Sequence, residues 1–186
     1  MNKWLFSQTL LKLSPTKRVA YIAVMTAFTV AANMFFEVKF MDVQFSFTIA
    51  VSALTGVILG PLAGFAACFL GDLVGFLYNS AGYAYYPWIG ISMGLVAVIF
   101  SLCLRLPFQG KIPLKIAIAS LLTFVICTVG INTTSFYFLY AKVGYFTYLF
   151  ARLFVQGQIW NSLVNYAALL LLLPILGAVK PLKINL

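Results

Sequence analysis

Long apolar runs, separated by short breaks rich in polar residues, glycine or proline, make up most of this chain. A helix needs about 20 mostly apolar residues to cross the roughly 30 Å hydrocarbon core of a bilayer. Measured against that length, the pattern predicts six transmembrane helices, at about residues 19–36, 45–59, 62–77, 85–104, 114–140 and 148–176. We therefore expect an all-α membrane protein in which residues 1–186 form a single transmembrane domain.

Two features of the pattern modify this simple picture. The pair Gly60–Pro61 interrupts an otherwise continuous apolar run. Because a Gly-Pro pair breaks a helix, two short helices joined by a tight turn are expected there. The fifth and sixth ranges are longer than one crossing requires, which predicts tilting or a non-helical end.

Residues 1–17 precede the first predicted span. Their apolar stretch is too short and too interrupted for the core of a secretory signal, and no small-residue cleavage site follows it. The leucines and aromatics of this segment could form a short helix on the cytoplasmic interface, ended by Pro15. A loosely ordered tail is the alternative.

Composition and charge support a membrane location and set its orientation. Hydrophobic residues make up 63% of the 186 residues and charged residues only 8%, too few to cover a soluble domain. Basic residues gather in three segments that share one side if there are six spans, namely Lys3, Lys12, Lys17 and Arg18, then Arg105, Lys111 and Lys115, then Lys180 and Lys183. The positive-inside rule places both termini in the cytoplasm. The net charge of +9 is spread over single residues beside apolar runs, which fits membrane lipid and not nucleic acid as a partner.

The residue types of this chain give little support for catalysis or for metal binding. The chain has no His, and its three cysteines, Cys68, Cys103 and Cys127, lie in apolar runs without metal-ligand spacing. A single carboxylate lies within a predicted span. We therefore expect no metal, no cofactor and no catalytic activity, and we interpret the cysteines as small buried hydrophobes.

Asp72 and Arg152 are charges inside predicted spans, both toward the outer half of the membrane. A charge in lipid costs at least about 2.5 kcal/mol, so it normally faces a protein interior, a partner or a cavity. The two side chains could pair with each other. Alternatively, Arg152 could bind an anionic ligand, since its planar fork suits a carboxylate.

Aromatic and amide side chains gather at the same membrane level. They lie in "YNSAGYAYYPW" (residues 78–88), in "NTTSFYFLY" (132–140) and in the first turns of the last helix, where Gln158 and Asn161 also occur. An interfacial belt explains tyrosines but not amides within spans. The pattern favours a pocket for a flat, polar organic molecule. Its candidate ligand-binding residues are Asp72, Asn79, Tyr85, Tyr86, Trp88, Asn132, Arg152, Gln156 and Trp160.

Small residues recur every four positions in the first span, at Ala23, Ala27 and Ala31. Such a stripe lets another helix approach closely, so it is a candidate surface for an external partner. The glycines at 56, 60, 64, 71 and 75 repeat the spacing, and for these we favour packing inside the bundle.

Four features together resemble the substrate-binding S-components of energy-coupling factor (ECF) vitamin transporters. They are the Ala-x-x-x-Ala pattern of the first span, "VQFSFTIAVSALTGVILGPLAGFAACFLGDLVG" (43–75), "YYPW" (85–88) and "ARLFVQGQIWNSLVNYAALL" (151–170). The last three are similar to the folate-type branch of that family. One departure is Gln44, where folate-type members often carry a basic residue; it joins the candidate ligand-binding residues, and it keeps cobalamin, a cobalamin precursor or pantothenate open as the vitamin.

The resemblance implies a bundle that binds a vitamin, most readily folate, for uptake across a bacterial cell membrane. It also implies that Ala23, Ala27 and Ala31 dock on a transmembrane coupling protein that carries two ABC-type ATPases. This chain has no Walker-type glycine loop, so it would not itself hydrolyse ATP. Two functions other than that of an S-component remain as alternatives: a stand-alone small-molecule facilitator and a membrane assembly subunit.

Overall fold

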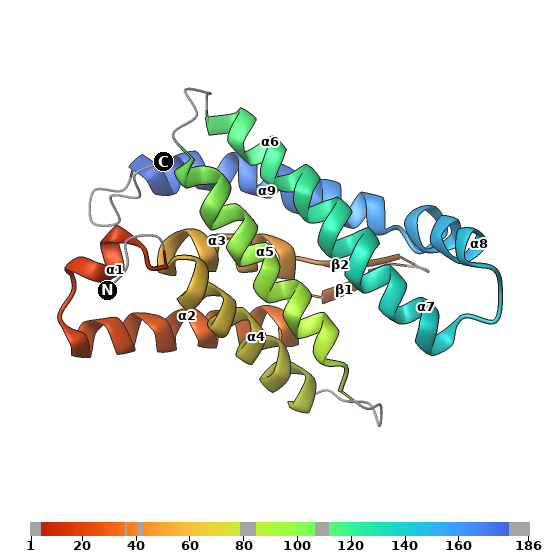
Figure 1. Ribbon diagram of the computed structural model, residues 1–186, viewed down its shortest axis with the longest axis horizontal. Coiled ribbons are helices and arrows are strands. Elements are labelled where there is room, and N and C mark those ends of the chain that lie inside the picture. Colours follow the sequence, from red (N-terminus) through yellow and green to blue (C-terminus); the bar gives the residue numbers. More distant parts are fainter. Residues whose placement is uncertain (1–4, 36, 41–42, 79–84, 107–111, 179–186) are drawn as a thin grey trace.

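The computed structural model describes residues 5–35, 37–40, 43–78, 85–106 and 112–178. Helices dominate, and one two-stranded antiparallel hairpin joins them (Figure 1). In chain order the elements are α1 (Gln8–Lys12), α2 (Pro15–Phe35), β1 (Glu37–Phe40), β2 (Val43–Ser46), α3 (Thr48–Leu59), α4 (Pro61–Tyr78), α5 (Pro87–Arg105), α6 (Ile112–Thr123), the π-helix η1 (Phe124–Thr133), α7 (Thr134–Tyr140), α8 (Tyr145–Phe150), the π-helix η2 (Ala151–Val155) and α9 (Gln158–Ala178).

The prediction of an all-α membrane bundle is confirmed. Five helices are long and apolar enough to cross a membrane, Pro15–Phe35, Pro61–Tyr78, Pro87–Arg105, Ile112–Tyr140 and Gln158–Ile175. The second predicted span, 45–59, is shorter than expected because its first residues belong to strand β2, which leaves the 12-residue α3. The hairpin pairs Glu37 with Ser46 and Phe40 with Val43.

Two predicted boundaries are wrong for identifiable reasons. The first span begins at Pro15 and not at about residue 19, because the first turn of a helix has no use for the N–H that proline lacks; the short helix expected before it is α1, which ends at Lys12. The range 148–176 is not one helix: it contains the end of α8, then η2, and then α9 after a break at Gly157, whose φ of 71° lies in the left-handed region.

The N-terminal segment packs on the bundle. The Ser7 N–H donates to the Leu59 carbonyl at 3.0 Å, and the Leu62 N–H donates to the Leu5 carbonyl at 3.1 Å. Leu10 of α1 is buried against Leu59 and Ala63. Residues 5–13 are therefore tied to the α3–α4 turn and do not form a loose tail.

That turn depends on Gly60, which has a φ of 99° and lies directly against the backbone of Ser7. Gly71 and Gly75 of α4 face Thr29 and Asn33 of α2, where an added Cβ would collide with them. These glycines accordingly serve internal packing, as the spacing indicated.

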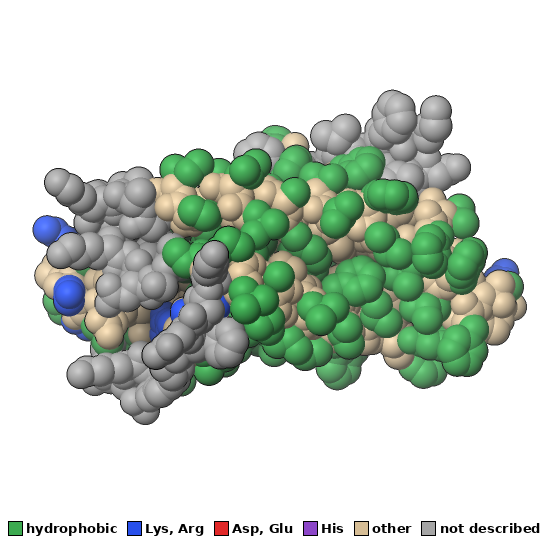
Figure 2. Space-filling model, turned by 90° about the horizontal axis from the view of Figure 1, so that it is seen from above, with side chains coloured by type: hydrophobic (Ala, Val, Ile, Leu, Met, Phe, Trp, Pro, Cys, Tyr) green, Lys and Arg blue, Asp and Glu red, His purple; other side chains and the backbone are tan. Residues whose placement is uncertain are grey.

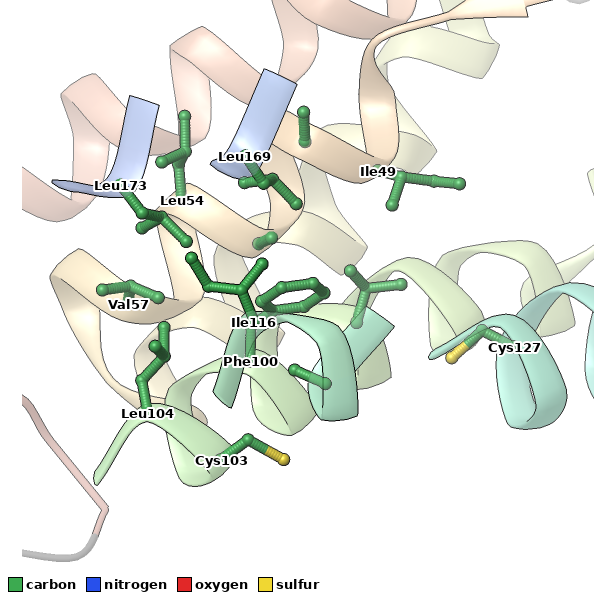
Figure 3. Packing of buried hydrophobic residues seen from close by; sticks show 14 residues of the cluster. Ile49, Leu54, Val57, Phe100, Cys103, Leu104, Ile116, Cys127, Leu169 and Leu173 are labelled. Carbon is green, nitrogen blue, oxygen red and sulfur yellow. The ribbon is translucent and has the colours of Figure 1, made fainter. Parts of the chain in front are cut away.

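The core lies between α3, α5, α6 and α9. Figure 3 shows side chains from these helices pointing toward one another around Phe100 and Ile116, both fully buried. All three cysteines are free and buried, and within the described segments no group of His, Cys, Asp or Glu could hold a metal ion.

The two ends of the molecule differ in charge. In Figure 1, α1, the α3–α4 turn and the last turns of α9 lie at one end, and the hairpin, α7 and α8 lie at the other. In Figure 2, Lys and Arg side chains gather at the first end, and hydrophobic side chains cover the surface between the ends. The basic end is the one expected in the cytoplasm.

Candidate functional site

A cavity of about 210 Å³ opens in the half of the bundle away from the basic end. Side chains from α2 to α9 line it: Asn33, Ser46, Thr48, Ile49, Asp72, Ile89, Met93, Thr128, Asn132, Phe136, Arg152, Gln158 and Asn161. Most of these are polar, in a bundle whose surface is apolar. Concave sites with a few fixed polar groups are typical of small-molecule binding.

Asp72 brings a carboxylate to the cavity from α4. It is 9% exposed, and its Oδ2 accepts a hydrogen bond from the Tyr85 hydroxyl at 3.0 Å. Tyr85 is held by ring contact with Phe76 at a centroid distance of 5.3 Å. Burial, followed by the charge of Asp72, raises the pKa of Tyr85, so its hydroxyl remains a donor. Tyr85 thus uses part of the hydrogen-bonding capacity of Asp72 and leaves its other lone pairs available.

Arg152 brings a guanidinium to the cavity from η2. Its Cζ lies 4.3 Å from the centroid of the Phe136 ring, a cation–π arrangement, and the side chain also lies close to Tyr148. Its Nε is buried without a hydrogen-bond partner. Within the described chain no ion pair joins Arg152 to Asp72, so the pairing that the sequence left open is not made.

The π-helix η1 forms the third wall. Its wider turn places Thr128 and Asn132 on the cavity, with Phe136 of α7 following on the same side. The Thr133 hydroxyl donates to the Thr128 carbonyl at 2.7 Å, a bond that supports the widened turn. The Asn132 Oδ1 is buried without a partner, which leaves an acceptor beside the cavity.

Two asparagines of α9 hold the fourth wall in place. The side chain of Asn161 lines the cavity, and Asn165 is fully buried one turn further on. Together they bind the backbone of Ser46 and Ala50, where β2 ends and α3 begins. Ser46 and Thr48 are thereby fixed at the cavity, with their hydroxyls 2.6 Å apart.

The family model of the ECF-type riboflavin transporter S component matches residues 13–181. The chain belongs to this family. No curated protein matches it. Among solved structures, the one described as "Crystal structure of FolT bound with folic acid" has a TM-score of 0.67 and 23% sequence identity, and the match covers 83% of this chain and 91% of that chain. This likeness shows that the two share a fold.

The suspected resemblance is thus confirmed at the level of the family. The S component is a multi-pass membrane protein and a vitamin-binding transport subunit, not an enzyme. The candidate site fits this role, since it is a polar cavity enclosed by membrane-spanning helices.

The S component brings some of the predicted site residues together and not others. Asp72, Asn132 and Arg152 line the cavity, and Tyr85 holds Asp72. Tyr86 instead packs its ring on Tyr140, at 6.2 Å between centroids. Asn79 and the side chain of Gln44 lie outside the described residues, although the backbone of Gln44 pairs with Lys39 in the hairpin.

Three predicted residues point away from the cavity. Trp88 and Trp160 are 59% and 56% exposed, and Gln156 is exposed where η2 ends. Trp160 precedes Asn161 on α9, and one residue turns a helix by about 100°, so only one of the two can face inward. These three residues lie on the outer surface of the S component.

Several lining residues escaped the sequence reasoning. Asn33, Ser46, Thr48 and Thr128 are short polar residues that nothing in the pattern separates from caps and ordinary helix positions. Ser46 and Thr48 had one local signal, because hydroxyl residues favour the start of a helix, and α3 starts at Thr48.

The alanine stripe lies on the surface of the S component. Ala23 and Ala27 are exposed and Ala31 is half-buried, whereas Thr29 and Ala32 of the same helix are buried. Thr29 packs on α4 and donates its hydroxyl to the Ala67 carbonyl at 3.2 Å. Helix α2 therefore uses one face inside the bundle and leaves the alanine face uncovered.

Proposed function

We propose that this S component binds folate for uptake. The observation that carries the proposal is the charge arrangement of the cavity: a carboxylate and a guanidinium face one space without pairing with each other. A buried charge is costly unless it is paired. A ligand that satisfies both groups at once would therefore gain more than one that satisfies either alone.

The pterin ring of folate suits Asp72. Its edge presents an amino group next to a ring N–H, two parallel donors that match the two oxygens of a carboxylate. The planar ring also suits a cavity that contains Phe136 as well as Met93 and Ile89, which provide apolar and aromatic surface.

The glutamate of folate suits Arg152. A carboxylate can bind the terminal N–H groups of the guanidinium as a bidentate pair, while the Phe136 ring holds the side chain in place. This pairing supplies the anion that the buried cation lacks. A basic residue at position 44, where this chain has Gln44, is then not required, because Arg152 of η2 provides the cation.

Riboflavin is the second candidate, favoured by the description of the matching family. Its ring edge alternates acceptor, donor and acceptor, which places a carbonyl oxygen against a carboxylate, and it has no carboxylate for Arg152. Pantothenate offers a carboxylate but no ring with paired N–H donors. Cobalamin and its macrocyclic precursors are much larger than folate, which makes folate the better match to a cavity of about 210 Å³.

Transport would use partners in the way the family does. Helix α2 would dock through Ala23, Ala27 and Ala31 on a transmembrane coupling protein, which in turn carries two ABC-type ATPases. The exposure of Ala23 and Ala27 supports this assignment, since small residues allow close helix approach in lipid.

The test is ligand binding by the purified protein in detergent. Folate, riboflavin and pantothenate are titrated separately, with binding followed by intrinsic tryptophan fluorescence and calorimetry. We expect folate to bind most tightly. Tighter binding of riboflavin would overturn the folate assignment while keeping the family role, and binding of no vitamin would favour a facilitator or an assembly subunit.

A further inference from the structure

The amide of Asn161 is locked in one orientation by its surroundings. Its Oδ1 faces the Ser46 N–H at 3.0 Å, and a backbone N–H can only donate. The side-chain atom at that position must therefore be the oxygen. The Nδ2 group is left on the other side of the amide, and no hydrogen bond in the described part of the chain uses it.

Asn165 enforces that orientation from one turn below. Its own orientation is fixed in the same way, because its Oδ1 accepts from the Ala50 N–H at 2.9 Å. Its Nδ2 then donates to the Ser46 carbonyl at 2.6 Å, to the Asn161 carbonyl at 2.8 Å and to the Asn161 Oδ1 at 3.2 Å. Rotating the Asn161 amide by half a turn would break the hydrogen bonds that its Oδ1 accepts from the Ser46 N–H and from the Asn165 Nδ2. It would also bring the Nδ2 groups of Asn161 and Asn165 together.

This fixed orientation determines which hydrogen bonds Asn161 can make to a ligand. A free asparagine can accept or donate by turning over, whereas this one presents donors only to the cavity that it lines. The neighbouring hydroxyls of Ser46 and Thr48 are already bonded to each other. Arg152 provides charged donors for an anion, so a neutral amide donor best matches a neutral acceptor.

We infer that Asn161 donates from Nδ2 to a ring carbonyl oxygen of the bound vitamin, and that Asn165 is the positioning residue that fixes this donor. This inference rests on the proposed function for the ligand ring. The consequence is selectivity: a ring with a carbonyl oxygen at this position is accepted, and one with an amino group there is disfavoured, because two donors would face each other.

The experiment compares folate with aminopterin, in which an amino group replaces the ring carbonyl oxygen. The variant Asn161→Asp keeps an oxygen for Ser46 and Asn165 but replaces the donor by an acceptor. We expect its affinity for folate to fall about tenfold and its affinity for aminopterin to rise, because the new acceptor faces the amino group of that ligand. An equal loss for both ligands, or no loss for folate, would overturn the inference.

Asn165→Asp tests the positioning role. It keeps the acceptor for Ala50 and loses the donors that hold Asn161, so the ratio of folate to aminopterin affinity should fall toward one. A purely structural role would weaken both ligands by the same factor and leave the ratio unchanged. Thermal unfolding without ligand identifies a variant that fails to fold, in which case Asn161→Asp alone decides.

Failure of the folate assignment is separable from failure of this inference. If the unaltered protein binds riboflavin and not folate, the same variants are titrated with riboflavin, whose ring also carries carbonyl oxygens. A loss of about tenfold in Asn161→Asp at unchanged thermal stability would retain the inference. Unchanged riboflavin affinity would overturn it.

Discussion

At the scale of single residues, the cavity is built from polar groups that other side chains hold in place. Tyr85 holds Asp72, the Phe136 ring holds Arg152, and Asn165 holds Asn161. Each functional group thus depends on a neighbour that fixes its position. Such support keeps a site in its binding geometry before the ligand arrives.

Arg152→Gln should lower folate affinity by about tenfold or more, because a charge-assisted bond to the glutamate is lost. Binding of 6-hydroxymethylpterin, which has the same ring and no carboxylate, should change by less than about twofold. Calorimetric titration of both ligands provides the measurement. An equal loss for the two would place Arg152 away from the glutamate.

Asp72→Asn should weaken folate binding by about tenfold, because an amide presents only one acceptor to the paired donors of the pterin. Tyr85→Phe is the matched control, since it removes a hydroxyl that touches Asp72 while preserving the carboxylate. We expect a smaller effect from the control. If riboflavin binding improves in Asp72→Asn, the carboxylate is confirmed as the group that disfavours that ring.

At the scale of elements, the deviations from regular helices coincide with the site. The π-helices η1 and η2 provide Asn132 and Arg152, and the break at Gly157 lies between η2 and the first turn of α9. π-helical turns carry a stability cost and are frequent at functional sites. The regular parts of the same helices supply the core, as at Ile116 and Leu169.

Thr133→Val should loosen the η1 wall, because it removes the hydroxyl bonded to the Thr128 carbonyl with almost no change in volume. We expect a loss of about 1 kcal/mol in stability and a several-fold loss in ligand affinity. Thr134→Val is the control, since Thr134 bonds to Tyr145 and not to the η1 backbone. Thermal unfolding and titration report the two effects, and equal behaviour of both variants would argue against a special role for Thr133.

Ala27→Trp should block docking of a coupling protein on α2 while leaving folate affinity unchanged, because Ala27 is exposed on the face away from the cavity. Leu163→Trp, at an exposed position of α9, is the matched control and should dock normally. Co-purification with the coupling protein and vitamin uptake by cells are the measurements. Loss of ligand binding as well would indicate a folding defect.

At the scale of the whole molecule, the two ends have separate tasks. The basic end carries the contact between residues 5–13 and the α3–α4 turn, and the opposite half carries the cavity. The buried residues packed with Leu10 of α1, Leu59, Ala63 and Ala67, do not line the cavity, so changes at the basic end should alter stability without altering affinity.

Gly60→Ala should lower the free energy of unfolding by about 1–3 kcal/mol, because φ is 99° and an added Cβ would meet the backbone of Ser7. Gly144→Ala is the control, since no atom lies within 4 Å of its Cβ position. We expect unchanged folate affinity in both variants once they are folded. A drop in affinity in Gly60→Ala alone would show that the two ends are coupled.

Sequence reasoning reached the fold more completely than the site. The length of apolar runs and the Gly60–Pro61 break identify most spans, because membrane crossing fixes length and composition together. Arg152 and Asp72 stand out as charges in lipid. The inward direction of Asn161 instead of Trp160, and the cavity positions of Ser46 and Thr128, depend on helix rotation and on π-turns, which apolar composition does not encode.

The burial of all three native thiols has a practical consequence for spectroscopy. Cys68, Cys103 and Cys127 are 1%, 8% and 1% exposed, so maleimide reagents should leave the folded protein unlabelled. A cysteine introduced at an exposed position such as Ser14, between α1 and α2, would then be the single site that a maleimide dye labels. The approach of a partner to the basic end becomes visible without rebuilding the chain on a cysteine-free background.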